Sequence, residues 1–248
     1  CGVVSLDYTG NKGIATSIGH APISGLIDSR KGSKNAIAEA LTNIVFAPLE
    51  KGIHSISLSA NWMWPCNNPG EDSRLYEAVE ECSKFAIDLG INIPTGKDSL
   101  SMKQKYSNYD VLSPGTVIIS AAGQCSDVKN IIKPVATAKG GEIFYVDFSQ
   151  DEFYLGGSSF AQSQECIGND TPGVTDAVYF KRAFNTVQDH IKAGKISAGH
   201  DIGSGGLITS LLEFCFPSLN IGMDLDFSCL EETDLVKILF SEKVGLNE

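Results

Sequence analysis

The stretch Lys34–Pro48, KNAIAEALTNIVFAP, decides the fold of this chain. Ile37, Leu41 and Ile44 recur at the spacing of one helix face, which predicts a helix whose apolar stripe packs against a core. Pro48 ends this helix, because proline cannot continue the backbone hydrogen-bond pattern. Several of the remaining positions are alanine, so another surface of the protein can approach the helix closely.

A polar pair, Glu39 and Asn43, lies on the same helix. The two residues are four positions apart, so their side chains project from one face, with Cβ atoms roughly 5–6 Å apart. Carboxylate and carboxamide oxygens are ligands of hard cations such as Mg²⁺, which usually shares its protein ligands with phosphates. The pair therefore indicates a metal–nucleotide site. A solvated polar helix face is the alternative, because such pairs are common on helices.

Composition limits the possible functions. The chain has 248 residues, of which 42% are hydrophobic and 20% charged, as expected for one large or two small globular domains. A net charge of −11 argues against a nucleic-acid partner, which would require clustered Lys and Arg. The chain contains no apolar run near the roughly 20 residues of a membrane span, so we expect no membrane partner.

Cysteine usage and the chain ends give two further expectations. The seven cysteines are scattered and odd in number, without a C-x-x-C pair, which indicates a reducing, cytoplasmic location rather than a disulfide framework. The chain opens on the strand-like run Gly2–Leu6 without a signal-peptide pattern, and it ends directly after a predicted helix. We therefore expect it to be a piece of a longer protein.

Periodicity predicts a mixed α and β architecture. A break with proline and paired glycines, between 131 and 141, predicts a boundary near residue 137, with one domain over 1–137 and another over 138–248. The predicted strands cover 2–7, 13–18, 53–64, 99–104, 115–123, 142–148 and 222–227, and the predicted helices cover 34–48, 72–89, 158–167, 176–193, 207–216 and 231–244.

The segment His200–Leu207, HDIGSGGL, is a candidate anion site. Its glycines precede a predicted helix, whose first backbone N–H groups and positive dipole end favour a phosphate. Asp201 offers one more oxygen to a metal. The alternative is a glycine-rich helix start without a ligand. The segment has neither the Walker A nor the dinucleotide-binding spacing.

Two other segments carry weaker signals. In Thr95–Met102, TGKDSLSM, Lys97 is placed to neutralise a phosphate, and the alternative is a polar turn in which Lys97 pairs with Asp98. Trp62 and Trp64 predict aromatic packing. No nucleophile motif and no zinc spacing is present, so the sequence assigns no catalytic residue.

The strings GIATSIGHAP, AEALTNIV, SLSANWMWPCNNPGEDSRLYEAVE, LGINIPTGKDSLSM, SPGTVIISA and GHDIGSGGLITSLLE occur here in the order found in large single-chain phosphoribosylformylglycinamidine synthases of purine biosynthesis. Nearly the whole chain resembles the second of the two related synthetase halves of that family. The resemblance implies an α/β fold of the α+β type. It comprises an A domain with a mixed sheet, similar to aminoimidazole ribonucleotide synthetase, and a partial α/β B domain.

The resemblance also implies a reaction for the parent enzyme. That ligase converts formylglycinamide ribonucleotide, ATP and glutamine to formylglycinamidine ribonucleotide, ADP, phosphate and glutamate. This half is then a structural copy that holds a nucleotide and Mg²⁺ and is inactive alone. The implied partners are the first synthetase half and the glutaminase domain. Once separated from them, the chain is expected to form a homodimer through its A-domain sheet.

Residue by residue, the resemblance implies that Glu39, Asn43 and Asp201 bind Mg²⁺, and that Gly203 and Lys97 contact ATP or ADP. Gly203 stands where the family has a nucleotide-contacting serine, and Ser204 replaces a second aspartate of the same loop. A further metal-binding aspartate of the family would precede Cys1. Two alternatives stay open: a non-catalytic scaffold with a decayed nucleotide site, and a stand-alone relative of aminoimidazole ribonucleotide synthetase.

Overall fold

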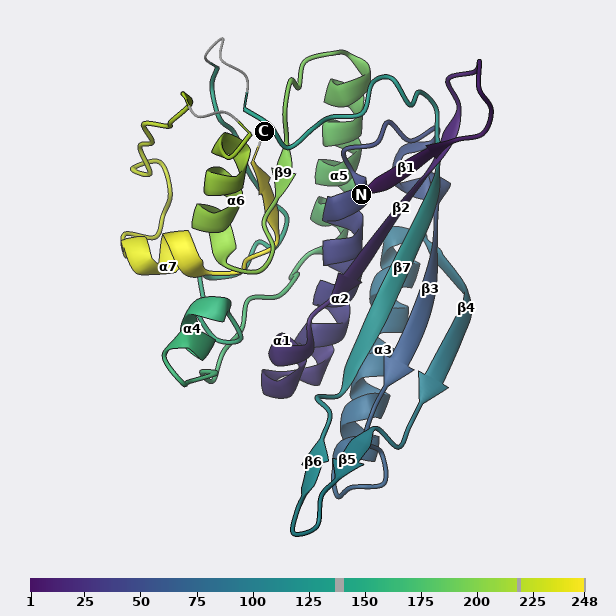
Figure 1. The fold of residues 1–248 in the computed structure, drawn as a ribbon, viewed down its shortest axis with the longest axis vertical. Coiled ribbons are helices and arrows are strands. Elements are labelled where there is room, and N and C mark those ends of the chain that lie inside the picture. The colour runs from purple at the N-terminus through teal and green to yellow at the C-terminus, as the bar shows by residue number, and fades with distance from the viewer. Residues whose placement is uncertain (137–140, 218–219, 248) are drawn as a thin grey trace.

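A five-stranded mixed sheet forms the frame of the first half of the chain (Figure 1). The computed structural model describes residues 1–136, 141–217 and 220–247. Only β3 and β4 pair in parallel, and the other neighbours are antiparallel. In spatial order the strands are β1 (Gly2–Ser5), β2 (Gly13–His20), β7 (Thr116–Cys125), β3 (Ile56–Met63) and β4 (Asn92–Ser99).

Two long helices cover one face of this sheet: α2 (Ser29–Ile44), which packs on β2 and β7, and α3 (Glu71–Leu89), which lies beside α2. The side chain of Asp28 caps the start of α2 by accepting from the backbone N–H groups of Arg30 and Lys31. The helix therefore begins five residues before the predicted position. It ends at Ile44, four residues before Pro48.

Helix α2 touches strand β2 through backbone atoms. A Cβ added at Gly19 would lie 2.2 Å from the carbonyl oxygen of Ala36 and 2.3 Å from the backbone nitrogen of Ala40. Ser17 lies two residues earlier on the same strand, and its hydroxyl donates to the carbonyl of Ala40 at 2.6 Å. Only glycine fits at position 19, and the alanines of the helix allow this approach.

The second half of the chain shares the main core. Phe148, Phe180 and Phe184 are fully buried together with the apolar stripes of α2 and α3. Phe180 and Phe184 lie on α5 (Ala177–Lys192), and Phe180 meets Phe85 of α3 edge to face at 5.7 Å. Burying aromatic side chains from both halves against each other supplies much of the energy that joins them.

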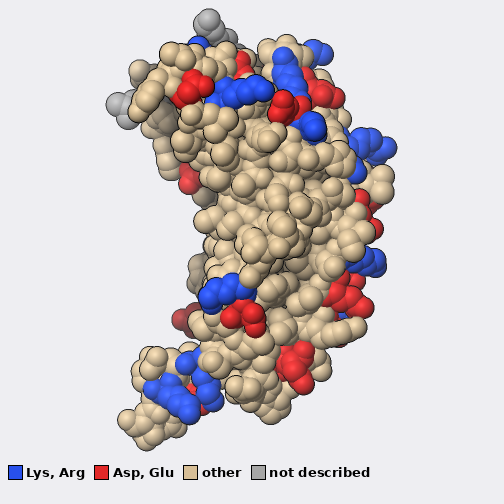
Figure 2. Space-filling view, turned by 90° about the vertical axis from the view of Figure 1, so that its right-hand side faces the viewer, with Lys and Arg blue, Asp and Glu red and all other residues tan. Residues whose placement is uncertain are grey.

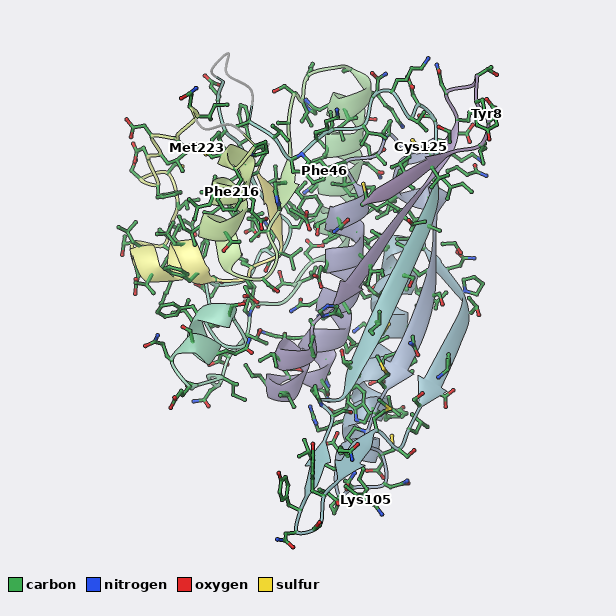
Figure 3. All side chains as sticks on the ribbon, viewed as in Figure 1. Tyr8, Phe46, Lys105, Cys125, Phe216 and Met223 are labelled. Atoms are coloured by element: carbon green, nitrogen blue, oxygen red, sulfur yellow. The ribbon has the colours of Figure 1, made fainter. Side chains whose placement is uncertain are left out.

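Gln188 of α5 completes the end of α2. Its side-chain amide donates to the carbonyls of Val45 and Ala47, and its oxygen accepts from the N–H of Leu49 at 2.8 Å. Phe46 lies in the same turn, where α2 meets the second half (Figure 3), and a Cβ at Gly199 would come within 2.2 Å of its ring. The carbonyls that a helix end leaves free thus find partners from the other half.

The second half also has a small layer of its own. Its three-stranded sheet has β10 (Gly245–Asn247) between β8 (Tyr145–Asp147) and β9 (His200–Asp201). A separate apolar cluster lies beside it, built on Ile202, Leu207, Leu211 and Ile238. The remaining elements are α1 (Pro22–Ile27), η1 (Gly52–Ser55), β5 (Lys103–Lys105), β6 (Asp110–Leu112), α4 (Ser159–Ser163), α6 (Gly206–Cys215) and α7 (Leu235–Phe240).

The structure confirms the mixed fold and most predicted elements. The strand predicted over 53–64 is β3 preceded by η1, and the helix predicted over 158–167 is the shorter α4. Residues 222–227 form no strand. The strand predicted over 99–104 is instead β4, which ends at Ser99, and the separate short strand β5. The helix predicted over 231–244 shrinks to α7, because β10 begins at Gly245. The predicted boundary at residue 137 lies outside the described residues.

One face of the sheet carries exposed apolar side chains. Val4, Ile14 and Ile18 are 70%, 43% and 59% exposed, and Val4 pairs directly with Ile14. Figure 2 views the molecule from the side of the sheet, and a broad area without Lys, Arg, Asp or Glu fills its centre. No helix in the described part of the chain is long and apolar enough to cross a bilayer.

Substituting alanine for Gly19 tests the contact between α2 and β2. The added methyl group meets backbone atoms that cannot rotate away, so Gly19→Ala should lower the free energy of unfolding by at least roughly 2 kcal/mol in urea denaturation. Gly222→Ala is the matched control, because a Cβ there meets nothing within 4 Å. Equal stability of the two variants would contradict the account.

Candidate metal and phosphate site

Glu39 and Asn43 are the two partly exposed residues in an otherwise buried stretch, 35–49. Both are only partly exposed, which argues against a fully solvated helix face. The two side chains border different spaces. Glu39 lines a cavity between the two halves of the chain, whereas Asn43 lines a neighbouring groove with Cys1 and Thr16.

The cavity beside Glu39 has a volume of about 140 Å³. Its wall combines the end of β2, helices α1 and α2, and three loops of the second half. The side chains and backbone segments that line it are His20 to Ser24, Asn35, Glu39, Gly156, Gly157, Ser159, Gln162, Thr171, Ile202 to Ser204, Glu242 and Val244. The wall mixes apolar surface with polar side chains such as Asn35, Glu39 and Glu242, and a few such polar groups can orient a small ligand.

Glu39 is held in place by the strand next to it. Its Oε2 accepts the backbone N–H of His20 at 2.7 Å, a bond that the close packing of β2 on α2 makes possible. Burial raises the pKa of Glu39, and the negative charges of Asp201 and Glu242 raise it as well, whereas the bond from His20 and the charge of that side chain lower it. A cation in this cavity would relieve the repulsion among these acids.

Asp201 reaches this region from β9, which pairs with β10 and contacts α2. Beside it, His200 is held between two oxygen atoms: its Nδ1 lies 2.6 Å from the carbonyl of Asp201, and its Nε2 lies 2.9 Å from a carboxylate oxygen of Glu213. Asp201 does not line the cavity, but it lies near enough to Glu39 for its charge to add to the effect of burial in raising the pKa of Glu39.

The glycine-rich loop after β9 leads into α6, as the sequence predicts. Gly205 is the N-cap, with a φ of +91° that favours glycine, and the start of α6 has no side-chain cap. The N–H of Gly205 donates to Oε1 of Glu242 at 2.7 Å. Glu242 carries no signal in the sequence, because no motif marks an isolated glutamate whose partner is 37 positions away.

Lys97 lies elsewhere. It is exposed on the edge strand β4, where its ammonium group donates to the hydroxyl of Ser99 at 2.8 Å rather than pairing with Asp98. It borders a groove formed with Trp62 and Leu75, not the cavity that contains Gly203. The sequence grouped Lys97 with Gly203 as nucleotide contacts, and the structure does not bring them together.

The donor set fits a hard cation in part. Within the described ranges, no three His, Cys, Asp or Glu side chains converge closely enough to hold a metal by themselves. Glu39 and Asp201 provide carboxylate oxygens. The charges of Asp201 and Glu242, which add to the effect of burial in raising the pKa of Glu39, favour a cation. Mg²⁺ usually takes one or two carboxylates and completes its shell with waters and phosphates, which suits this arrangement.

The fold is of the α+β type and is consistent with an AIR synthase-like fold. Residues 154–246 match the family model described as AIR synthase related protein, C-terminal domain. The chain belongs to the FGAR-AT PurM_N-like domain family, whose model matches residues 1–124. The two matched regions lie on either side of the predicted domain boundary.

Two relatives that match nearly the whole chain are both named phosphoribosylformylglycinamidine synthase. A probable phosphoribosylformylglycinamidine synthase of Arabidopsis thaliana is 39% identical over 98% of this chain, and the phosphoribosylformylglycinamidine synthase of Homo sapiens is 35% identical over 98%. The chain spans only 17% and 18% of these two relatives.

Solved structures show the same fold. T. maritima PurL complexed with FGAR matches 99% of this chain and 38% of that chain, with a TM-score of 0.75 and 18% identity. T. maritima PurL complexed with AMPPCP matches 100% of this chain and 37% of that chain, with a TM-score of 0.70 and 15% identity.

The raised pKa of Glu39 predicts how stability depends on pH. In the folded state the carboxyl holds its proton to a higher pH than the ordinary value of 4.5, so ionisation disfavours folding as pH rises through that window. Glu39→Gln removes this cost. In urea denaturation, the stability of Glu39→Gln relative to wild type should therefore increase from below pH 4.5 toward neutrality.

The exposed Glu80 supplies the control for this pH dependence, because Glu80→Gln changes the net charge equally without touching the cavity. Its stability relative to wild type should stay nearly constant over the same pH range. A pH-independent difference for Glu39→Gln would show that the Glu39 carboxyl titrates normally in the folded chain.

Proposed function

We propose that this chain is a structural nucleotide-binding half of a phosphoribosylformylglycinamidine synthase. One observation carries the proposal: Glu39 and Glu242 line one cavity with Gly203 and Ser204, just before α6, and Asp201 lies near enough for its charge to raise the pKa of Glu39 further, beyond the effect of burial. Carboxylates that attract a cation, next to backbone N–H groups that attract an anion, suit a nucleotide bound with Mg²⁺.

In this proposal Glu39 and Asp201 bind Mg²⁺ directly. Asn43 lies one helical turn from Glu39 and would complete the metal shell from its neighbouring groove. The phosphates of ATP or ADP would lie against Gly203 and the first turn of α6. We propose a phosphate contact for Lys97 only at its own groove beside β4, because it does not border this cavity.

The reaction belongs to the parent enzyme. We propose that the parent is a ligase that converts formylglycinamide ribonucleotide, ATP and glutamine to formylglycinamidine ribonucleotide, ADP, phosphate and glutamate. The names of the relatives support this proposal. The chain spans under a fifth of those relatives, so we propose that it performs no turnover by itself and assign it no catalytic residue. A cytoplasmic location is likewise proposed, although the Arabidopsis relative is named chloroplastic/mitochondrial.

A second function has its own support. Gly203 offers no hydroxyl, and Glu242 already takes a hydrogen bond at the start of α6, as expected if the nucleotide site has decayed and the domain only supports its neighbours. The two functions differ in one measurable property, the affinity for Mg²⁺ and ADP. A non-catalytic scaffold should bind neither.

Titration calorimetry with ADP and Mg²⁺ separates the two functions. The nucleotide-binding proposal predicts heat of binding for wild type and its loss in Glu39→Gln, which removes a charged metal ligand. A Cβ at Gly203 meets nothing within 4 Å, so Gly203→Ser fits and should bind several-fold more tightly, since one added hydrogen bond is worth about 1 kcal/mol.

The same proteins allow two controls. Gly203→Ala adds the Cβ without the hydroxyl and should bind as wild type does. With ATP, formylglycinamide ribonucleotide and ammonia added, the wild-type chain should release no phosphate. Binding unaffected by Glu39→Gln would remove Glu39 from the site, and turnover would refute the structural role.

We also propose that the exposed face of the sheet pairs with another synthetase half: the first half in the parent enzyme, or a second copy of this chain when it is alone. Val4, Ile14 and Ile18 make that face apolar, and large exposed apolar patches usually mark interfaces. The glutaminase domain is the other proposed partner within the parent.

Light scattering tests the self-association. At micromolar concentration the wild-type chain should have the mass of a dimer, whereas Ile14→Lys, which places a charge in the centre of the face, should be monomeric. Val178→Lys is the matched control, because Val178 is 71% exposed on α5, away from the sheet. A monomeric wild type would contradict the proposed pairing.

A further inference from the structure

Glu242 occupies the position at which an anion would bind the start of α6. A single oxygen atom, Oε1, accepts three hydrogen bonds: from the N–H of Gly205 at 2.7 Å, from the N–H of Ser159 at 2.7 Å and from the hydroxyl of Ser159 at 2.8 Å. Gly205, the N-cap of α6, and Ser159, the first residue of α4, lie 37 and 83 positions from Glu242 in the sequence. A carboxylate with three short bonds is strongly held, because charge-assisted hydrogen bonds are about twice as strong as neutral ones.

The same donors are suited to a phosphate. The N–H groups at the start of a helix of 10 residues carry the positive end of its dipole, and the hydroxyl of Ser159 can donate to any oxyanion. Gly203, Ser204 and Ser159 all line the cavity in which Glu39 lies. A phosphate that used these donors would compete with Glu242 for them.

A second, independent feature of this cavity indicates a ligand. Asn35 lines it and is 7% exposed, and its Oδ1 has no hydrogen-bond partner among the described residues. Its Nδ2 is used, donating to Ser24 at 3.1 Å and to the carbonyl of Pro172 at 2.8 Å. A buried acceptor without a partner has lost its hydrogen bonds to water without compensation, and a donor group on a ligand would restore one.

We propose that Glu242 is an internal substitute for a ligand phosphate, and that a nucleotide binds this cavity by displacing its carboxylate from Gly205 and Ser159. The inference rests on the proposed nucleotide-binding function and adds a residue that limits affinity. No bond is made or broken: one oxyanion replaces another at the same three donors.

Displacement also explains why a cation accompanies the nucleotide. The released carboxylate stays beside Glu39 and Asp201, so bringing phosphates into the cavity adds negative charge to three acids. A divalent cation offsets that repulsion, and the carboxylates beside the cavity can bind it. The cavity should therefore bind a nucleotide much more weakly without the metal.

Glu242→Gln tests whether Glu242 takes the place of a ligand phosphate. The glutamine keeps the size of the side chain and an acceptor oxygen, but it loses the charge that makes the bonds strong. Calorimetry with Mg²⁺ and ADP should show roughly tenfold tighter binding than wild type, which corresponds to 1.4 kcal/mol. Glu80→Gln changes the net charge equally on the exposed face of α3 and should bind as wild type does.

A measurement on wild type guards against a variant that fails to fold. In ¹⁵N–¹H spectra, the amide signals of Gly205 and Ser159 should shift together as ADP and Mg²⁺ are added, because both lose the same partner. Inorganic pyrophosphate serves as a second probe, since it has the oxyanions of ADP without the nucleoside.

The outcomes distinguish this inference from the function on which it rests. Tighter binding of ADP by Glu242→Gln, with joint shifts of the two amides, supports both. Equal affinity of wild type and Glu242→Gln overturns the role of Glu242 and leaves nucleotide binding intact. If only pyrophosphate binds, and binds more tightly to Glu242→Gln, then Glu242 does take the place of a phosphate, but the nucleotide-binding proposal fails. If neither probe binds either protein, both are refuted.

Discussion

The backbone contact between Gly19 and helix α2 is the constraint on which the rest of the structure depends. It lets α2 lie against β2 without a side chain between them, and it places the N–H of His20 where Glu39 can accept it. One carboxylate, that of Glu39, is thereby fixed at the end of a strand, where the two halves of the chain meet.

The aromatic residues of α5 and the side chain of Gln188 hold the second half against the same helix. Asp201 and Glu242 are therefore held near Glu39. The site is a consequence of how the two halves pack.

One part of the cavity favours a cation, and the other favours an anion. Burial raises the pKa of Glu39, the charges of Asp201 and Glu242 raise it further, and the three acids together favour a cation. The backbone N–H of Gly205 at the start of α6 favours an anion. Without a ligand, the protein satisfies this second part with its own Glu242. This internal pairing keeps the polar groups hydrogen-bonded, as buried polar groups generally are, and it leaves the acids with an unbalanced charge. A metal–nucleotide complex brings both signs of charge at once, which is why it suits this cavity better than either ion alone.

The sequence predicted those parts of the fold that local patterns determine. Helices α2, α3, α5 and α6 and strands β2, β3 and β7 follow from periodicity. The roles of Glu39, Asp201 and the loop at Gly203 stay predictions. The incorrect predictions have a common cause, because they concern features that depend on pairing between distant parts of the chain. Residues 222–227 alternate like a strand, but Met223, Leu225 and Phe227 pack on the small apolar cluster without a strand partner. Strands β9 and β10 are too short to show a period. Glu242 has a role only because folding brings it to Gly205 and Ser159, and Lys97 was misplaced because sequence alone does not reveal which groove a loop borders.

Replacing Mg²⁺ with paramagnetic Mn²⁺ tests most directly whether Glu39 and Asp201 share one ion. In ¹⁵N–¹H spectra of the chain with ADP, a trace of Mn²⁺ broadens the amide signals nearest the metal. The account predicts that the signals of His20, Glu39 and Asp201 broaden together, while that of Lys97 on β4 stays sharp. Broadening that spared Glu39 and Asp201, or that centred on Lys97, would contradict a metal site between the two halves.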